Sequence, residues 1–166
     1  NGELWPALTW LDGRGMAGGE HGQEGHSGAS GMSLRHARIR PDGGRDEEIE
    51  LDGLTCECCQ TAAVMTNEGA LIAYRDRSDD EIRDIRLRRR EASGWRDAGY
   101  LFSDGWEISG CPVNGPSLDA RGDRVAVAWF TAADGRPVVK AGMSRDAGRS
   151  FDFYELEAGG VLGRVD

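Results

Sequence analysis

Long hydrophobic runs and positive net charge are both missing from this sequence. No apolar stretch approaches the roughly 18 residues that a membrane-spanning helix requires. The formal net charge is -9, which argues against non-specific binding to nucleic acid or to an anionic membrane, because both need clustered positive charge. The one basic run, from Arg86 to Arg90, is interrupted by Leu87 and is predicted to form the exposed side of a strand.

The sequence equally lacks the common motifs of nucleotide binding and of serine hydrolysis. It has no Walker loop, no Rossmann fingerprint and no nucleophile elbow. The Gly-rich stretch 15–31 follows no strand-to-helix pattern, so we do not expect it to hold a phosphate. The chain begins at Asn1 with neither Met nor a signal-peptide pattern, from which we expect a processed or cut N-terminus.

Helical periodicity is scarce, whereas turn signals are abundant. The best helical candidate, residues 79–90, has imperfect apolar spacing and is rich in charge. The chain has 25 glycines, and its short apolar segments are separated by turn pairs such as Asp12-Gly13, Asp42-Gly43, Asp104-Gly105, Asn114-Gly115 and Asp134-Gly135. With 39% hydrophobic residues, this pattern predicts a packed all-β domain with many hairpins.

A repeat of 55 residues runs through the chain. The segments Gly69 to Tyr74 and Asp123 to Trp129 are matching apolar strands, and their closing aromatic residues lie 55 positions apart. The segment Pro6 to Trp10 has the same character upstream and is followed by a longer insertion. Self-similarity at a fixed period predicts several copies of one supersecondary unit.

A turn motif recurs with the same period. Ser144 to Phe151 fits the pattern S-x-D-x-G-x-[ST]-[FW], known as the Asp-box, at every position. The copy at Arg40 to Glu47 keeps the Asp and the second Gly, and the copy at Arg88 to Trp95 keeps only the aromatic residue. Asp before Gly favours a hairpin turn because Asp caps nearby backbone amides and Gly accepts a positive φ angle.

These motifs resemble the sialidase-like family of β-propellers, whose repeats are called BNR or Asp-box repeats. Residues 104–116 and Cys56 to Cys59 are similar to a bacterial exo-sialidase branch of that family. The resemblance implies blades that are four-stranded antiparallel sheets, here about three blades (1–54, 55–110 and 111–166) of a six-bladed ring. The remaining blades are then expected from the same polypeptide, from a second copy in a homodimer, or from a partner chain.

Propeller topology sorts the loops between two ends. Successive turns of a four-stranded meander alternate between the ends of the sheet, so Asp-box turns share one end with the turns between strands one and two. The opposite end, which we call the loop end, collects the remaining loops. These are predicted at 12–31, 75–81 and 131–137 within blades, and at 52–60 and 103–116 between blades.

All four cysteines fall in the connections at the predicted loop end. Cys56 and Cys111 lie 55 positions apart and so occupy equivalent places in neighbouring repeats. Cys56, Cys58, Cys59 and Cys111 can form disulfides, remain buried thiols, or bind a soft metal such as copper or zinc. His21 and His26, in the Gly-rich insertion, are candidates to add imidazole ligands, although such a loop is commonly only a loop.

A charged stretch after Tyr74 supplies candidate catalytic groups. Sialidase-type hydrolysis needs arginines that hold a carboxylate together with an acid and a nucleophile, and Arg75, Asp76, Arg83 and Asp84 offer suitable groups. The Arg-Ile-Pro motif of sialidases proper is absent from the sequence. The alternative is that these four residues form salt bridges around the end of a strand.

Three functions follow as hypotheses for this chain. The first is a secreted or periplasmic propeller that binds glycans or acts on them as a glycoside hydrolase. The second is a propeller that binds copper or zinc through its cysteines. The third is a non-catalytic interaction scaffold with disulfide-bonded cysteines. Trp106 is the tryptophan that we expect to serve at a ligand site, whereas Trp5, Trp10 and Trp129 are expected to pack in the core or between blades.

Overall fold

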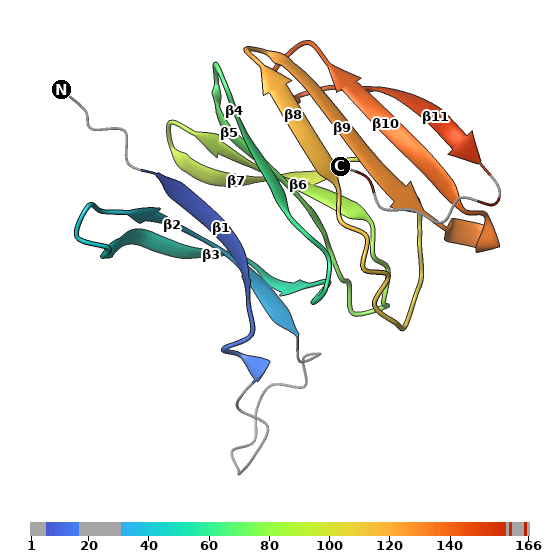
Figure 1. Ribbon diagram of the computed structural model, residues 1–166, viewed down its shortest axis with the longest axis horizontal. Coiled ribbons are helices and arrows are strands. Elements are labelled where there is room, and N and C mark those ends of the chain that lie inside the picture. The colour runs from blue at the N-terminus through green and yellow to red at the C-terminus, as the bar shows by residue number, and fades with distance from the viewer. Residues whose placement is uncertain (1–5, 17–30, 159, 161–164, 166) are drawn as a thin grey trace. The chain divides into compact units, whose positions relative to one another are not determined.

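The prediction of an all-β chain is confirmed. The computed structural model describes residues 6–16, 31–158, 160 and 165, and within them eleven strands form three antiparallel sheets of three, four and four strands (Figure 1). The described part contains no α-helix, and a short 3-10 turn, η2, lies at Ala133–Gly135. Among these residues no helix is long and apolar enough to cross a membrane. By its contacts the chain divides into two compact units, 1–57 and 58–166.

The first unit is one three-stranded meander. It consists of β1 (Ala7–Asp12), β2 (Met32–Ile39) and β3 (Arg45–Thr55), in that order across the sheet. The fourth strand expected for this repeat is not among the described residues. In the turn between β2 and β3, the carboxylate of Asp42 accepts a hydrogen bond from the Gly44 backbone N–H at 2.8 Å.

The second unit contains two four-stranded meanders. The first is built from β4 (Ala62–Thr66), β5 (Gly69–Arg75), β6 (Ile85–Glu91) and β7 (Gly94–Tyr100). The second is built from β8 (Ser117–Arg121), β9 (Arg124–Thr131), β10 (Val138–Ser144) and β11 (Asp152–Ala158). In each sheet the strands pair in chain order, as the repeat predicts.

One apolar core joins the two sheets of the second unit. It contains Leu71, Ala73, Ile85, Leu87 and Leu101 from the β4–β7 repeat and Val125, Val127 and Trp129 from β9, each at most 6% exposed. Alternate residues of a strand point to opposite faces, so β5 and β9 each bury one set of side chains here. At about 25 cal/mol per Å² of buried apolar area, this core is the main source of stability for the unit.

The Asp-box at 144–151 folds as its residue types predict. The carboxylate of Asp146 accepts hydrogen bonds from the backbone N–H groups of Arg149 and Ser150 at 3.0 and 2.9 Å, and from the Ser150 hydroxyl at 2.6 Å. These bonds hold the pKa of Asp146 well below its ordinary value. Gly148 has a φ angle of +79°. The Phe151 ring packs against the core described above.

The predicted alternation of turns is confirmed within the second unit. The Asp-box turn lies beside the β8–β9 turn, because the Ala147 N–H donates to the Asp123 carbonyl at 2.8 Å. It also lies beside the β4–β5 turn, through an ion pair between Arg149 and Glu68 at 2.5 Å. We call this the Asp-box end of the unit; the β5–β6 and β7–β8 connections lie together at the other end, the loop end (Figure 1).

Candidate functional site

The loop end of the second unit is held together by the connection between the two sheets. Residues 101–116 of this connection run along the β5–β6 loop, where the Ile108 N–H donates to the Glu81 carbonyl and the Arg83 N–H to the Trp106 carbonyl, at 3.0 and 2.9 Å. The Gln60 side chain accepts from the Gly115 N–H at 2.9 Å. The predicted convergence of residues 75–81 with 103–116 is therefore confirmed.

Arg75, a candidate for binding a substrate carboxylate, lies at the centre of this end and is 1% exposed. Its three guanidinium nitrogens donate to the backbone carbonyls of residues 114, 83 and 130, at 2.5, 2.5 and 2.6 Å. The guanidinium also lies over the Trp106 ring, 4.9 Å from its centre. Burial lowers the pKa of Arg75 to about 10. In this arrangement Arg75 braces three segments and offers no nitrogen that is not already bound.

Asp84 and Arg83 also hold backbone in place. The Asp84 carboxylate accepts the N–H groups of Gly105 and Trp106, at 2.8 and 3.0 Å. Arg83 donates to the Ile108 carbonyl at 3.1 Å and pairs with Glu81 at 2.7 Å. Both residues are 3% exposed. Arg83 fits the alternative of salt bridges around a strand end through its pair with Glu81, although it is buried, whereas Asp84 binds backbone N–H groups.

Asp76 belongs to a more accessible group of side chains. Asp76 itself is 2% exposed. Its carboxylate accepts hydrogen bonds from Arg86 at 2.9 Å and from the Tyr100 hydroxyl at 3.0 Å. Arg86 lies over the Tyr100 ring at 5.1 Å and also pairs with Asp97. Tyr100 is 42% exposed. We call Asp76, Arg86, Asp97 and Tyr100 the Tyr100 cluster.

Three members of the Tyr100 cluster, Arg86, Asp97 and Tyr100, were not among the candidate functional residues of the sequence analysis. Arg86 and Tyr100 come together because they are direct partners in the pairing of β6 with β7. That register is not visible in the sequence, although a tyrosine that ends a predicted strand is a usable signal. Burial, followed by the negative charge of Asp76, raises the pKa of Tyr100 to about 12.

A second group of polar side chains, around Asp104, attaches the connection 101–116 to strands β9 and β10. The Asp104 carboxylate, whose side chain is 1% exposed, accepts from the Trp129 indole N–H and from Lys140, both at 2.7 Å. Trp106 is 7% exposed and packs edge to face against Phe130 at 5.6 Å. The expectation that Trp106 offers an exposed surface for a ligand is therefore wrong, because its ring packs inside the loop end.

The cysteines are oxidised in this structure. Cys58 and Cys111 form a disulfide, with their Cα atoms 6.3 Å apart, which ties the start of the second unit to the β7–β8 connection. Cys56 and Cys59 are disulfide-bonded as well, and none of the described cysteines is a free thiol. A disulfide sulfur cannot act as a thiolate ligand. The copper or zinc site at Cys56, Cys58, Cys59 and Cys111 therefore remains a prediction for the reduced protein only.

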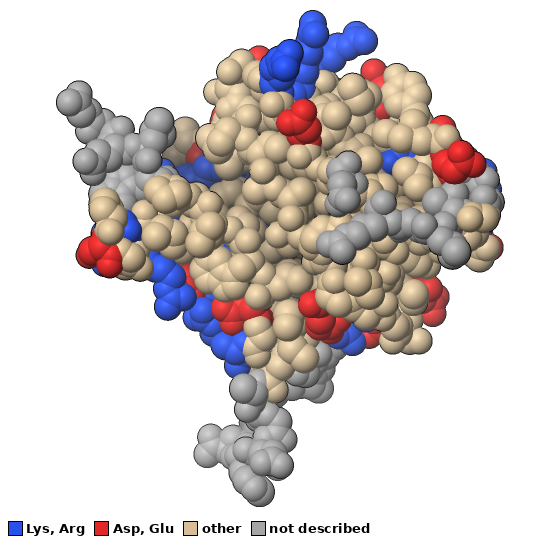
Figure 2. All heavy atoms as spheres, in the orientation of Figure 1, with Lys and Arg blue, Asp and Glu red and all other residues tan. Residues whose placement is uncertain are grey.

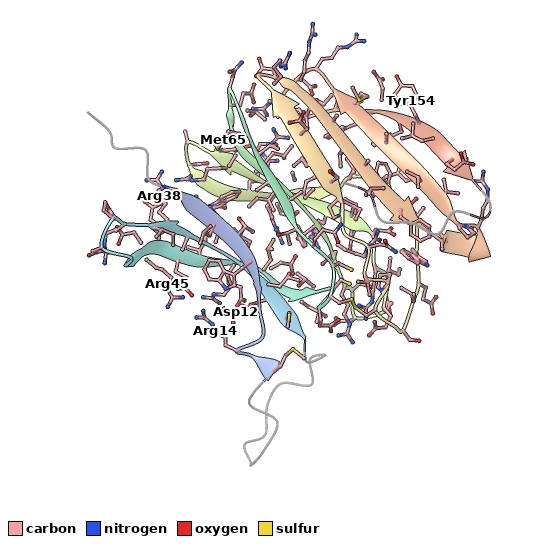
Figure 3. The ribbon with its side chains drawn as sticks, viewed as in Figure 1. Asp12, Arg14, Arg38, Arg45, Met65 and Tyr154 are labelled. Atoms are coloured by element: carbon pink, nitrogen blue, oxygen red, sulfur yellow. A yellow bond between two sulfur atoms is a disulfide. The ribbon has the colours of Figure 1, made fainter. Side chains whose placement is uncertain are left out.

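The remaining predicted metal ligands are two histidines within the residue range of the first unit. His21 and His26 fall outside the described residues. At the start of their loop, Asp12 accepts from the Trp10 indole at 2.9 Å and pairs with Arg14 at 2.7 Å; Asp12 and Arg14 are labelled in Figure 3. The hydrogen bonds from Arg14 hold the pKa of Asp12 well below its ordinary value. The end of β1 is thus fixed by an internal ion pair.

The chain was compared with protein-family models, with curated proteins and with solved structures, and none of them matches it. The likeness to sialidase-like propellers consequently rests on the motifs and their spacing.

Proposed function

We propose that this chain is part of a sialidase-like Asp-box propeller that binds glycans in the periplasm or outside the cell. The observation that carries the proposal is the folded Asp-box at 144–151, which joins the last two strands of a four-stranded meander. The β5–β6 and β7–β8 connections lie together at the opposite end of the sheets. The disulfide between Cys58 and Cys111 supports an oxidising compartment.

The packing of repeated sheets supports the propeller. Leu71 and Ala73 on β5 pack against the second sheet of the unit, and one repeat later these positions are Ala126 and Ala128 on β9. The pairing of β9, β10 and β11 places Met143 and Tyr154 on the same face as these alanines. Met143, Tyr154 and Leu156 are 48%, 52% and 60% exposed.

That face is suited to another sheet of the same kind. Its surface over β8 to β11 is mostly uncharged, with charged side chains along the borders (Figure 2), and Tyr154 is labelled in Figure 3. Exposed hydrophobic side chains on one face, here Met143, Tyr154 and Leu156, mark an interaction site. We infer that the remaining blades cover it, supplied by the same polypeptide, by a second copy in a homodimer, or by a partner chain.

The side chains of the loop end are better suited to binding a glycan than to hydrolysing one with the four candidate catalytic residues. Arg75, Arg83 and Asp84 are buried and bound to backbone groups, as described above. Tyr100, by contrast, presents a half-exposed ring next to the charged groups of Arg86 and Asp97, a combination of apolar surface and hydrogen-bonding groups that suits a sugar. We therefore assign glycan contact to the Tyr100 cluster.

A glycan array probed with the oxidised chain tests the proposal. We expect binding to a restricted set of glycans that Tyr100→Ala abolishes. Arg136→Gln is the control, because it changes an exposed side chain between β9 and β10 that lies outside the Tyr100 cluster. If no glycan is bound by the chain in its assembled form, the proposal fails.

Hydrolysis is tested separately with an aryl sialoside and related aryl glycosides. Turnover that disappears in Arg75→Lys or Asp76→Asn, while the fold remains intact, would restore the enzymatic hypothesis. We expect no turnover that depends on Arg75, because its nitrogens are all bound to carbonyls.

A further inference from the structure

A hollow with an arginine-rich lining lies at the Asp-box end of the second unit, opposite the loop end. Its volume is about 180 Å³, and it is lined by Arg89, Glu91, Arg96, Asp97, Ala98 and Arg149. We call it the arginine hollow. Three guanidinium groups face two carboxylates here, although acidic residues outnumber basic ones in the chain as a whole, by 29 to 20.

Arg89 forms the fixed floor of the hollow. It is 6% exposed, and its two terminal nitrogens donate to the carbonyls of Ala147 and Gly148 in the Asp-box turn, both at 2.6 Å. These carbonyls carry no net charge, so the hydrogen bonds hold the guanidinium without neutralising it. Burial, followed by the positive charge of Arg149, lowers the pKa of Arg89, as expected for a cation that would be stabilised by a nearby anion.

The other two arginines are accessible. The Arg96 side chain is 70% exposed, and its nearest carboxylate, that of Glu91, is 3.8 Å away, which is an ion pair beyond hydrogen-bond distance. The Arg149 side chain is 53% exposed and is directed by its bonds to Glu68. Arg96 in particular has the freedom to turn toward a ligand.

The carboxylates of the lining are partly neutralised by arginines. Asp97 pairs with Arg88 at 3.0 Å and with Arg86. Among the described residues, the Glu91 carboxylate has one ion pair, the long contact with Arg96 at 3.8 Å. Within the lining, three guanidinium groups face two carboxylates. Arg149 is also paired with Glu68, so Arg96 is the most accessible cation of the hollow and Arg89 the buried one below it.

We propose that the arginine hollow binds a tetrahedral oxyanion, a sulfate or phosphate group, between Arg89, Arg96 and Arg149. Guanidinium groups suit such an anion because their planar N–H groups bind two of its oxygens at once. The hollow has room for the anion and for part of the molecule that carries it. The hollow shares Asp97 with the Tyr100 cluster, but the three arginines proposed to hold the anion lie outside that cluster, so their variants test the anion site separately from the glycan site.

Titration of the full oxidised chain with inorganic sulfate, followed by NMR at constant ionic strength with chloride as the reference, tests this proposal. We expect saturable shifts of the backbone amide signals of Arg96, Ala98 and Arg149. Arg96→Gln should weaken the affinity for sulfate by about tenfold, the effect of losing one charge-assisted contact. Arg149→Gln should act similarly.

Arg136→Gln is the matched control. Arg136 is also an exposed arginine, with a side chain 57% exposed, and it pairs with Glu155 on the second sheet. This variant should bind sulfate as the unmodified chain does. Shifts that do not saturate, or that are as strong in Arg96→Gln as in Arg136→Gln, would overturn the proposal.

The source of the anion is distinguished by two further probes. Inorganic phosphate and a sulfated disaccharide are titrated in the same way. Tighter binding of the disaccharide than of sulfate identifies the hollow as a site for a sulfate ester, whereas equal affinities identify it as a site for the free ion. If Arg149→Gln does not fold, the exposed Arg96→Gln variant decides the result.

Discussion

The disulfide between Cys58 and Cys111 should contribute a large part of the stability of the second unit. The two residues are separated by 53 positions, so the bond closes a loop that contains the whole first sheet of that unit. The loop-entropy relation gives about 4 kcal/mol for a loop of this length at 25 °C. We therefore expect the double variant Cys58→Ser with Cys111→Ser to lose about 4 kcal/mol of unfolding free energy.

Urea denaturation of the oxidised proteins measures this loss. With a dependence of about 2 kcal/mol per molar urea, the midpoint should fall by about 2 M. The unmodified chain treated with a reductant provides a second comparison and should unfold at least as easily as the double variant. A midpoint within about 0.5 M of the unmodified chain would refute the reasoning, because it would mean that the bond does not restrain the unfolded chain.

Four further predictions follow from the contacts described. Arg75→Lys should cost at least about 2 kcal/mol in urea denaturation, because a lysine cannot reach three carbonyls at once. Asp146→Asn should destabilise the chain at pH 7 by about 1 kcal/mol, as loss of a capping carboxylate does. Since the pKa of Asp146 is lowered by folding, this contribution is present above pH 4 and is lost as the pH falls below it, so denaturation curves of the variant and the unmodified chain should converge in acid. In an absorbance titration of tyrosine ionisation, the difference between the unmodified chain and Tyr100→Phe reports Tyr100 alone. Its midpoint should lie near pH 12, and Asp76→Asn should lower that midpoint. Elemental analysis of the oxidised chain should find far less than one copper or zinc per chain; stoichiometric metal retained without a reductant would show that the cysteines are ligands.

The sheets and turns were predictable because they depend on local chemistry. Both signals involve residues that are close in the sequence. One is the alternation of apolar residues in β5 and β9, and the other is the set of Asp and Gly residues in the 144–151 turn. The 55-residue spacing of Tyr74 and Trp129 then placed the loops at two ends. Within the second unit the structure follows this arrangement.

The roles of the charged residues were not predictable from the sequence. The sequence shows that Arg75 is charged but not that carbonyls from three separate segments surround it. Equivalent positions in two repeats suggested that Cys56 and Cys111 are related, yet equivalence does not imply contact, and the bond joins Cys58 to Cys111. Such long-range contacts depend on strand register and on loop paths, which local patterns do not determine.

The affinity of the assembled, oxidised chain for the strongest ligand of the glycan array tests the central proposal most directly. Isothermal titration should give saturable binding that Tyr100→Ala weakens by at least about tenfold, which corresponds to about 1.4 kcal/mol. Arg136→Gln, a surface variant outside the Tyr100 cluster, should leave the affinity unchanged. The absence of saturable binding, or equal affinities in the two variants, would contradict the assignment of glycan binding to the Tyr100 cluster.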